Sequence, residues 1–65
     1  MYILVDLTNN EIPDSYYLYS ESEVIDTCQQ NLNMEDENPE KVISFDRAKC
    51  LLLTRFEYKV CEVKT

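Results

Sequence analysis

The sequence predicts an α+β fold of the order ββααβ, in which helices cover one face of a three-stranded antiparallel sheet. Two observations support this prediction. Apolar residues alternate along both ends of the chain, and two apolar stripes with helical spacing follow Ser20 and Ser44. We expect one domain over residues 1–65, with a small core, because so short a chain buries only about 60% of its unfolded surface.

The first two expected strands form a hairpin. Residues 1–7 alternate loosely and are apolar on both faces, which is typical of a central strand. Residues 8–11 contain two asparagines, which tolerate positive φ, and predict the turn. Residues 12–19 return as the second strand, although Pro13 can donate no ladder hydrogen bond and limits pairing on one side.

The first helix is expected to begin after Ser20. Ser20 and Glu23 have the spacing of a capping box, and Tyr19 and Val24 occupy the hydrophobic-staple positions. One helix face carries the expected core residues Val24, Ile25, Cys28 and Leu32. The expected outward-facing residues are Glu23, Asp26, Gln29 and Gln30.

Residues 33–40 predict an acidic loop. The spacing of Asn31, Asn33 and Glu35 is similar to that of a calcium loop, but no glycine occupies the sixth position, and the twelfth is Val42. We therefore expect no calcium site.

The second half is expected to contain a short strand at residues 42–43, a helix over 45–54 capped by Ser44, and a closing strand from Phe56. A helical stripe of Phe45, Ala48, Leu51 and Leu52 favours the helix. A strand over 50–54 is the alternative, because this apolar run has no period of its own. In the closing strand, Phe56, Tyr58 and Val60 alternate with Glu57 and Lys59.

The three cysteines, Cys28, Cys50 and Cys61, form no Cys-x-x-Cys pair, and the chain has no histidine. Zinc would therefore need carboxylate ligands, and we expect buried reduced thiols, no metal and no cofactor. The chain has no histidine, so the usual general base is missing. It also has no glycine, which phosphate-binding loops require. We expect no enzyme activity.

Charge is divided unevenly along the chain. Residues 1–40 contain ten acids and no base, whereas residues 41–65 contain three acids and six bases, so the halves carry −10 and +3 of the net −7. An acidic first segment disfavours direct binding to nucleic acid or to an anionic membrane. A basic protein is the complementary partner.

The expected partner-binding residues combine carboxylates with an exposed tyrosine. Tyrosine is enriched in binding hot spots. An expected strand directs Tyr16, Tyr17 and Tyr19 to both of its faces, and of these three we expect Tyr17 to face outward. The full set is Glu11, Asp14, Tyr17, Glu21, Glu23, Asp26, Glu35, Asp36 and Glu37. A solvated acidic face without a partner is the alternative.

The chain shows no signal-peptide pattern and no apolar run of the roughly 20 residues that span a bilayer. We expect a complete small gene product in the cytoplasm. The short, acidic, glycine-free and tyrosine-bearing chain resembles, in size and composition, the small early proteins with which bacteriophages inhibit host enzymes. Those proteins include DNA-mimicking inhibitors of nucleases, uracil glycosylases, restriction enzymes and CRISPR effectors. The resemblance implies a bacterial host cell as the compartment.

The sequence thus supports the hypothesis of a non-enzymatic inhibitor or regulator of a basic host protein, acting as an anti-host or anti-defence factor. Both a mimic of DNA and a plain acidic binder fit this pattern. The alternative is a homo-oligomeric structural or antitoxin-like module, such as a homodimer, that pairs through a strand edge and tyrosines.

Overall fold

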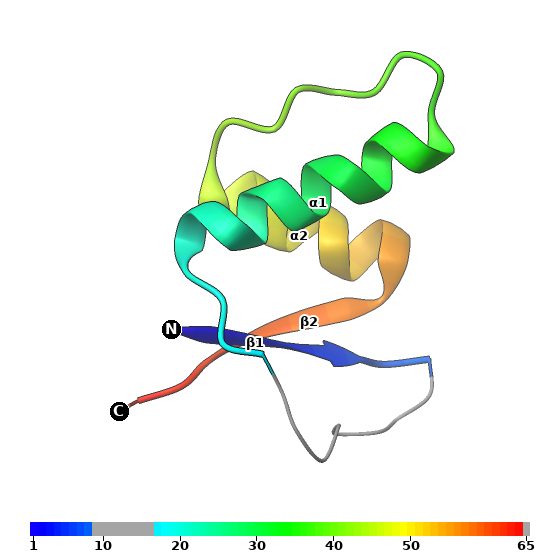
Figure 1. Cartoon of the computed structure of the whole chain (residues 1–65). Helices are drawn as coiled ribbons and strands as arrows, with labels where there is room; N and C mark the ends of the chain where they lie inside the picture. Colours follow the sequence, from blue (N-terminus) through cyan, green and yellow to red (C-terminus); the bar gives the residue numbers. More distant parts are fainter. Residues whose placement is uncertain (9–16, 65) are drawn as a thin grey trace.

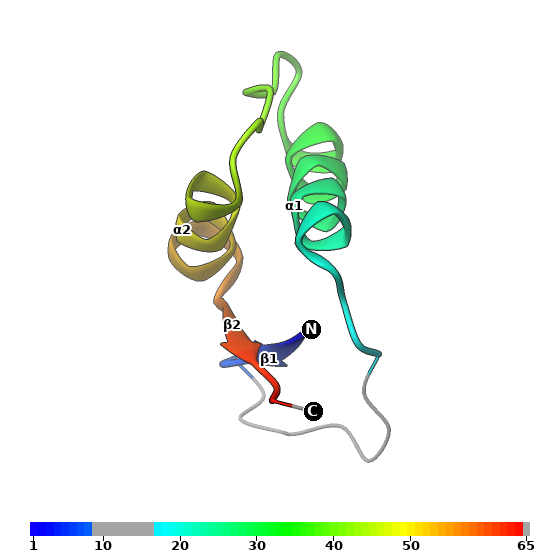
Figure 2. The same cartoon turned by 90° about the vertical axis from the view of Figure 1, so that its left-hand side faces the viewer.

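The computed structural model describes residues 1–8 and 17–64. Within them the elements follow in the order β1 (Tyr2–Asp6), α1 (Glu21–Glu35), α2 (Phe45–Phe56) and β2 (Tyr58–Glu62). The two helices lie side by side above a sheet formed by β1 and β2 (Figures 1 and 2). The α+β class is consistent with this arrangement. The three-stranded sheet and the order ββααβ are not confirmed, because the described residues form a two-stranded antiparallel sheet.

The two strands come from the two ends of the described chain. Ile3 pairs with Cys61 and Val5 with Lys59 in the antiparallel register. On the other edge of β1, Tyr2 and Tyr19 form an isolated bridge with two N–H···O bonds of 2.8 Å. Residues 17–19 are the described part of the expected second strand, and within them Tyr19 alone forms a bridge to β1. Residues 9–16, with most of the expected turn and Pro13, lie outside the described residues.

Helix α1 begins where its capping box predicts. The Glu23 N–H donates to Ser20 Oγ at 3.3 Å, and the Ser20 N–H donates to Glu23 Oε1 at 3.1 Å. Val24, Cys28 and Leu32 are buried on its inner face, as expected, and Ile25 packs against them.

The acidic loop is shorter than expected, because α1 continues to Glu35. No proline or glycine interrupts residues 33–35, and the Asp36 N–H donates to the Leu32 carbonyl at 2.9 Å to complete the last turn. Asn31, Asn33 and Glu35 therefore belong to a helix, whose geometry is not that of a calcium loop.

Residues 42–43 do not form the expected strand, and a side chain of α1 provides the reason. Gln29, expected to face solvent, accepts the Val42 N–H at 2.7 Å through Oε1 and donates to the Glu40 carbonyl at 2.9 Å through Nε2. This amide fastens the extended loop along α1 and places Val42 in the core. Gln29 therefore holds the connection between the helices in place.

Helix α2 confirms the helical prediction for residues 50–54 and excludes the alternative strand. Ser44 Oγ caps it by accepting the Arg47 N–H at 3.1 Å. The helix ends at Phe56, which was expected to begin the closing strand. Glu57 follows in a left-handed conformation, with φ 58° and ψ 38°, and turns the chain into β2. Periodicity could not locate this turn, because left-handed geometry is uncommon for glutamate.

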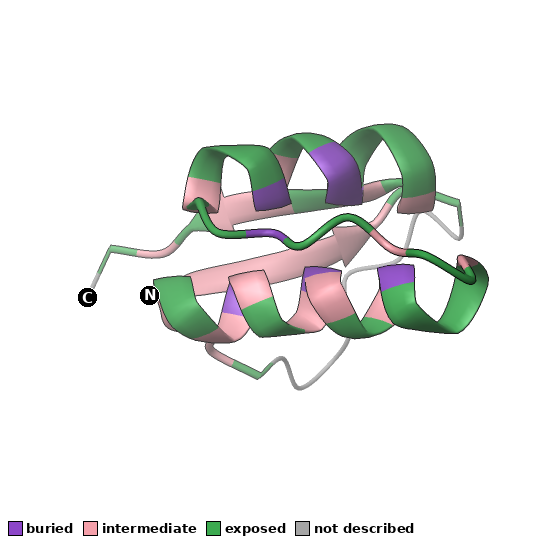
Figure 3. Cartoon of the chain, turned by 90° about the horizontal axis from the view of Figure 1, so that it is seen from above, coloured by how far each residue is buried: buried purple, intermediate pink, exposed green. Residues whose placement is uncertain are grey.

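The core lies mainly between the helices (Figure 3). Its buried residues among those described are Val24, Cys28, Leu32, Val42, Ala48, Leu51 and Leu52. Tyr2, Leu4, Tyr58 and Val60 of the sheet pack against this cluster from below and stay partly exposed. The expectation for the cysteines is only partly right. Cys28 is buried, but Cys61 is half-buried and Cys50 is exposed, and all three are free thiols.

Adjacent leucines on α2 test this placement of the core. Leu52 is fully buried and Leu53 is 46% exposed. We expect Leu52→Ala to lower the free energy of unfolding by about 2–5 kcal/mol, because it leaves a cavity between the helices. Leu53→Ala is the matched control and should cost less than about 1 kcal/mol. Equal shifts of the urea midpoint for the two variants would contradict this assignment.

Candidate partner-binding surface

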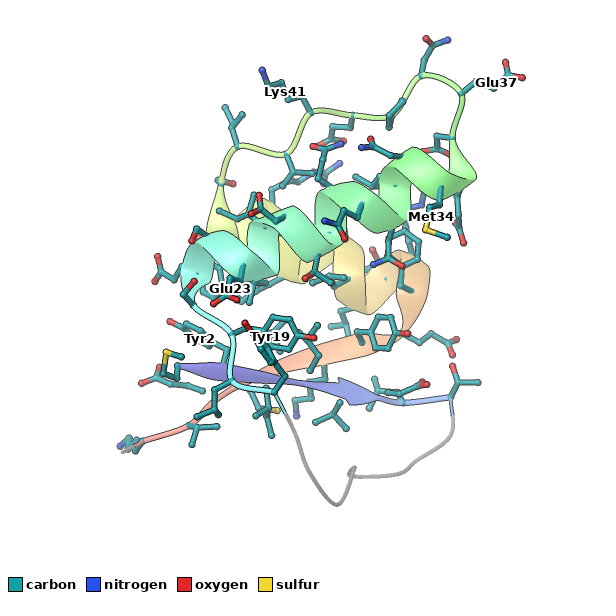
Figure 4. The ribbon with its side chains drawn as sticks, viewed as in Figure 1. Tyr2, Tyr19, Glu23, Met34, Glu37 and Lys41 are labelled. Carbon is teal, nitrogen blue, oxygen red and sulfur yellow. The ribbon has the colours of Figure 1, made fainter. Side chains whose placement is uncertain are left out.

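The described acidic residues of the predicted surface divide between the two ends of α1. Glu21, Glu23 and Asp26 belong to its N-terminal end, and Glu35, Asp36 and Glu37 to its C-terminal end and the loop beyond. Figure 4 shows Glu23 and Glu37 far apart along this axis. Glu11 and Asp14 lie outside the described residues. The described members of the predicted set therefore do not form one patch.

At the N-terminal end, tyrosines hold two of the carboxylates in place. The Tyr17 hydroxyl donates to Glu23 Oε2 at 2.5 Å, and the Tyr2 hydroxyl donates to Glu21 Oε1 at 3.3 Å. The Tyr17 and Tyr19 rings pack edge to face with centroids 4.8 Å apart. Figure 4 shows Tyr2, Tyr19 and Glu23 at the same end of the fold.

We call this group the tyrosine–carboxylate cluster. Its members are Tyr2, Tyr17, Tyr19, Glu21, Glu23 and Asp26. Tyr17 is 62% exposed, which confirms the expectation that it faces outward. Tyr2 was considered with the tyrosines around Tyr17 but was not among the predicted partner-binding residues. Its place depends on the pairing of the first residues with Tyr19, a contact between distant positions that local patterns do not show.

Within this cluster Glu23 keeps its negative charge. The hydrogen bond from Tyr17, followed by those from Ser20, lowers the pKa of Glu23. The same bond and the adjacent carboxylate raise the pKa of Tyr17, while burial and then Glu21 raise the pKa of Tyr2. Both tyrosines therefore stay neutral hydrogen-bond donors at pH 7. Among the described residues, no lysine or arginine forms an ion pair with Glu21, Glu23 or Asp26.

Beyond the C-terminal end of α1, arginines of α2 neutralise most of the acidic groups. Arg55 donates to both oxygens of Asp36, at 2.9 and 3.2 Å, and lies 3.8 Å from Glu35. Arg47 binds Glu40 through two bonds of 2.8 Å. These bonds lower the pKa of Asp36 and of Glu40.

The basic second half of the chain thus folds back onto part of the acidic first half. Glu37 is the member of the predicted loop triplet that forms no ion pair with a described residue. Spacing along the chain did not predict this neutralisation, because it depends on how α2 packs beside α1. The tyrosine–carboxylate cluster therefore remains the better candidate for a charged binding surface.

Neither a metal-binding cluster nor a membrane-spanning helix is found in the described part of the chain. No three described cysteine or carboxylate groups lie close enough together to hold a metal ion. No described helix is long and apolar enough to cross a bilayer. Comparisons with family models, curated proteins and solved structures found no match for this chain.

The arginine pairs predict a pH dependence of stability. A carboxylate whose pKa is lower in the folded state stabilises the fold above its unfolded pKa, and this contribution is lost as the pH falls through the folded value. Relative to ordinary values of 3.8 for Asp36 and 4.5 for Glu40, the folded pKa values are lower. We therefore expect the loss below about pH 4.5 to be smaller in the variant D36N/E40Q than in the parent.

Urea denaturation at several pH values between 6 and 3 measures this difference. Glu37→Gln is the control, because it removes a carboxylate that has no arginine partner in the described residues, and it should retain the slope of the parent. A D36N/E40Q variant with the same slope as the parent would show that these pairs do not stabilise the fold.

Proposed function

We propose that this protein is a non-enzymatic binding protein that docks on a basic protein through the tyrosine–carboxylate cluster. One observation carries the proposal. Glu21, Glu23 and Asp26, at the capped end of α1, form no ion pair with a described lysine or arginine, and Glu23 accepts a hydrogen bond from the exposed Tyr17. A basic partner would be steered by the charge and would bury the tyrosine at the contact.

The capping box supports this role because it restricts the surface before binding. Glu23 binds the Ser20 N–H through one oxygen and the Tyr17 hydroxyl through the other, so its carboxylate has a defined orientation. A preorganised group loses less conformational entropy on binding than a free side chain. The partially positive N-terminus of α1 also favours the ionised form of Glu23, whose pKa is lowered.

Inhibition of a host protein is the biological role that we propose for this binding, as in the small acidic phage proteins that the chain resembles. A nucleic-acid-handling enzyme is the preferred target class, since its binding groove presents cationic side chains to phosphates. In that case the carboxylates would occupy phosphate positions, and the protein would act as a DNA mimic in the bacterial cytoplasm.

Charge reversal tests the surface. We expect E21K/D26K to lower affinity for the partner at least tenfold, since two favourable contacts become repulsive. Glu23 is left unchanged because it also caps the helix. E37K/E57K is the matched control, with the same change in net charge at positions outside the cluster, and it should bind as the parent does.

The measurement is capture from a bacterial lysate at low and high salt, followed by titration with the isolated partner. The proposal requires a basic protein that the parent and E37K/E57K retain at low salt, and that E21K/D26K and high salt release. Equal capture by both double variants would refute the acidic surface as the binding site.

A homo-oligomeric or antitoxin-like module is the second candidate function. The specific observation that favours it is the outer edge of β2, which pairs with no described strand. Sedimentation velocity at low micromolar concentration separates the two functions. The acidic-surface proposal predicts a monomer, whereas a dimer that persists in high salt would support the module.

A further inference from the structure

A shallow groove of about 420 Å³ lies between α2 and β2. It is lined by Lys49, Cys50 and Leu53 of the helix and by Lys59 and Val60 of the strand. The groove is mainly apolar, with two cationic side chains, and none of its lining residues belongs to the tyrosine–carboxylate cluster. Its volume is within the range of pockets that hold small ligands or side chains.

The outer edge of β2 borders this groove and carries backbone groups that pair with no described strand. In an antiparallel pair, successive residues direct their N–H and C=O groups alternately toward and away from the partner strand. The Val63 N–H donates to Met1, and the Leu7 N–H donates to the Glu57 carbonyl, which fixes the alternation. The backbone groups of Tyr58, Val60 and Glu62 therefore point to the outer edge, where no described strand pairs with them.

The lysines determine the charge that suits this edge. Lys49 Nζ lies 3.5 Å from Asp46 Oδ1, but Asp46 is almost fully exposed, and such pairs contribute little. An incoming carboxylate can therefore replace Asp46. Lys59 forms no ion pair with a described residue. Glu62, at the far end of β2, would repel an acidic ligand. Such a ligand is therefore best placed near Lys59, at the start of the strand.

We propose that the outer edge of β2 binds an extended segment of a partner protein in which apolar and acidic residues alternate. The segment adds a strand to the sheet and bonds to the Val60 N–H and carbonyl. Its apolar side chains enter the groove over Leu53, and its carboxylates reach the lysines. Added strands of this kind gain affinity from main-chain bonds and specificity from pockets for alternate side chains.

The charges and the backbone groups favour this occupant over two others. A second copy of the chain would bring its own Lys59 together with Glu62 to this edge, so its charge complements Lys59 less well than that of an acidic segment. A small carboxylate would fill the groove but would leave the edge N–H of Val60 unpaired. The proposed site is separate from the acidic surface, so the protein can hold two partners of opposite charge.

Amide hydrogen exchange with a short, capped peptide of alternating glutamate and leucine tests the site. We expect the peptide to slow exchange at the Val60 and Glu62 N–H groups at least tenfold. The N–H groups of Lys59 and Cys61 already face β1 and should change little. Alkylation of Cys50 by iodoacetamide should also slow, with half-buried Cys61 as the internal reference.

Charge-reversal variants test whether Lys49 and Lys59 contribute to binding of the peptide. K49E/K59E should weaken peptide binding by about five- to twentyfold, given up to about 1 kcal/mol for each exposed pair. K41E/K64E is the control with the same net charge and should bind as the parent does. Equal binding of a lysine–leucine peptide, or protection of Val60 that rises with protein concentration without peptide, would overturn the proposal. So would failure of the glutamate–leucine peptide to bind.

Discussion

The packing of α1 against α2 is the constraint on which the rest of this small fold depends. Apart from Val42, every buried residue among those described belongs to one of the two helices. The sheet contributes only partly exposed side chains, so it supports the helix pair and cannot form a core by itself. The loop between the helices must follow the same packing. Gln29 of α1 satisfies the backbone of that loop, and arginines of α2 bind its carboxylates.

This packing also redistributes the charge. Along the chain the acids come first and the bases later, which indicates one long acidic surface. In space, Arg47 and Arg55 bind carboxylates of the acidic loop, whereas Glu21 and Glu23 at the N-terminal end of α1 accept hydrogen bonds from tyrosines. Hydrogen bonds from neutral tyrosines orient these carboxylates without cancelling their charge. Of the acidic residues at the two ends of α1, those at the N-terminal end therefore pair with no described lysine or arginine, whereas most of those at the other end do. Lys49 and Lys59 lie beside the groove at β2.

Local sequence patterns predicted where both helices begin, but they could not predict contacts between residues that are distant in the sequence. Ser20 with Glu23, and Ser44 before its apolar stripe, located both helix starts, because caps act within one turn. The predicted end of α2 was wrong, because the sequence pattern does not reveal the left-handed turn at Glu57. The role of Gln29 was missed because it depends on Val42, which is 13 positions away in the sequence. The exposure of Tyr17 was predicted from strand alternation. The neutralisation of Asp36 by Arg55 was not, because it joins residues 19 positions apart.

The electrostatic potential near each backbone amide can be measured by NMR, from relaxation induced by a cationic and an anionic nitroxide of similar size. Between the two ends of α1, we expect the more negative potential over residues 21–26. We expect a markedly weaker potential over residues 35–40, where the arginines of α2 bind the carboxylates. A uniform negative potential over both segments, or a minimum over residues 35–40, would show that the arginines of α2 do not make the C-terminal end of α1 less negative than its N-terminal end.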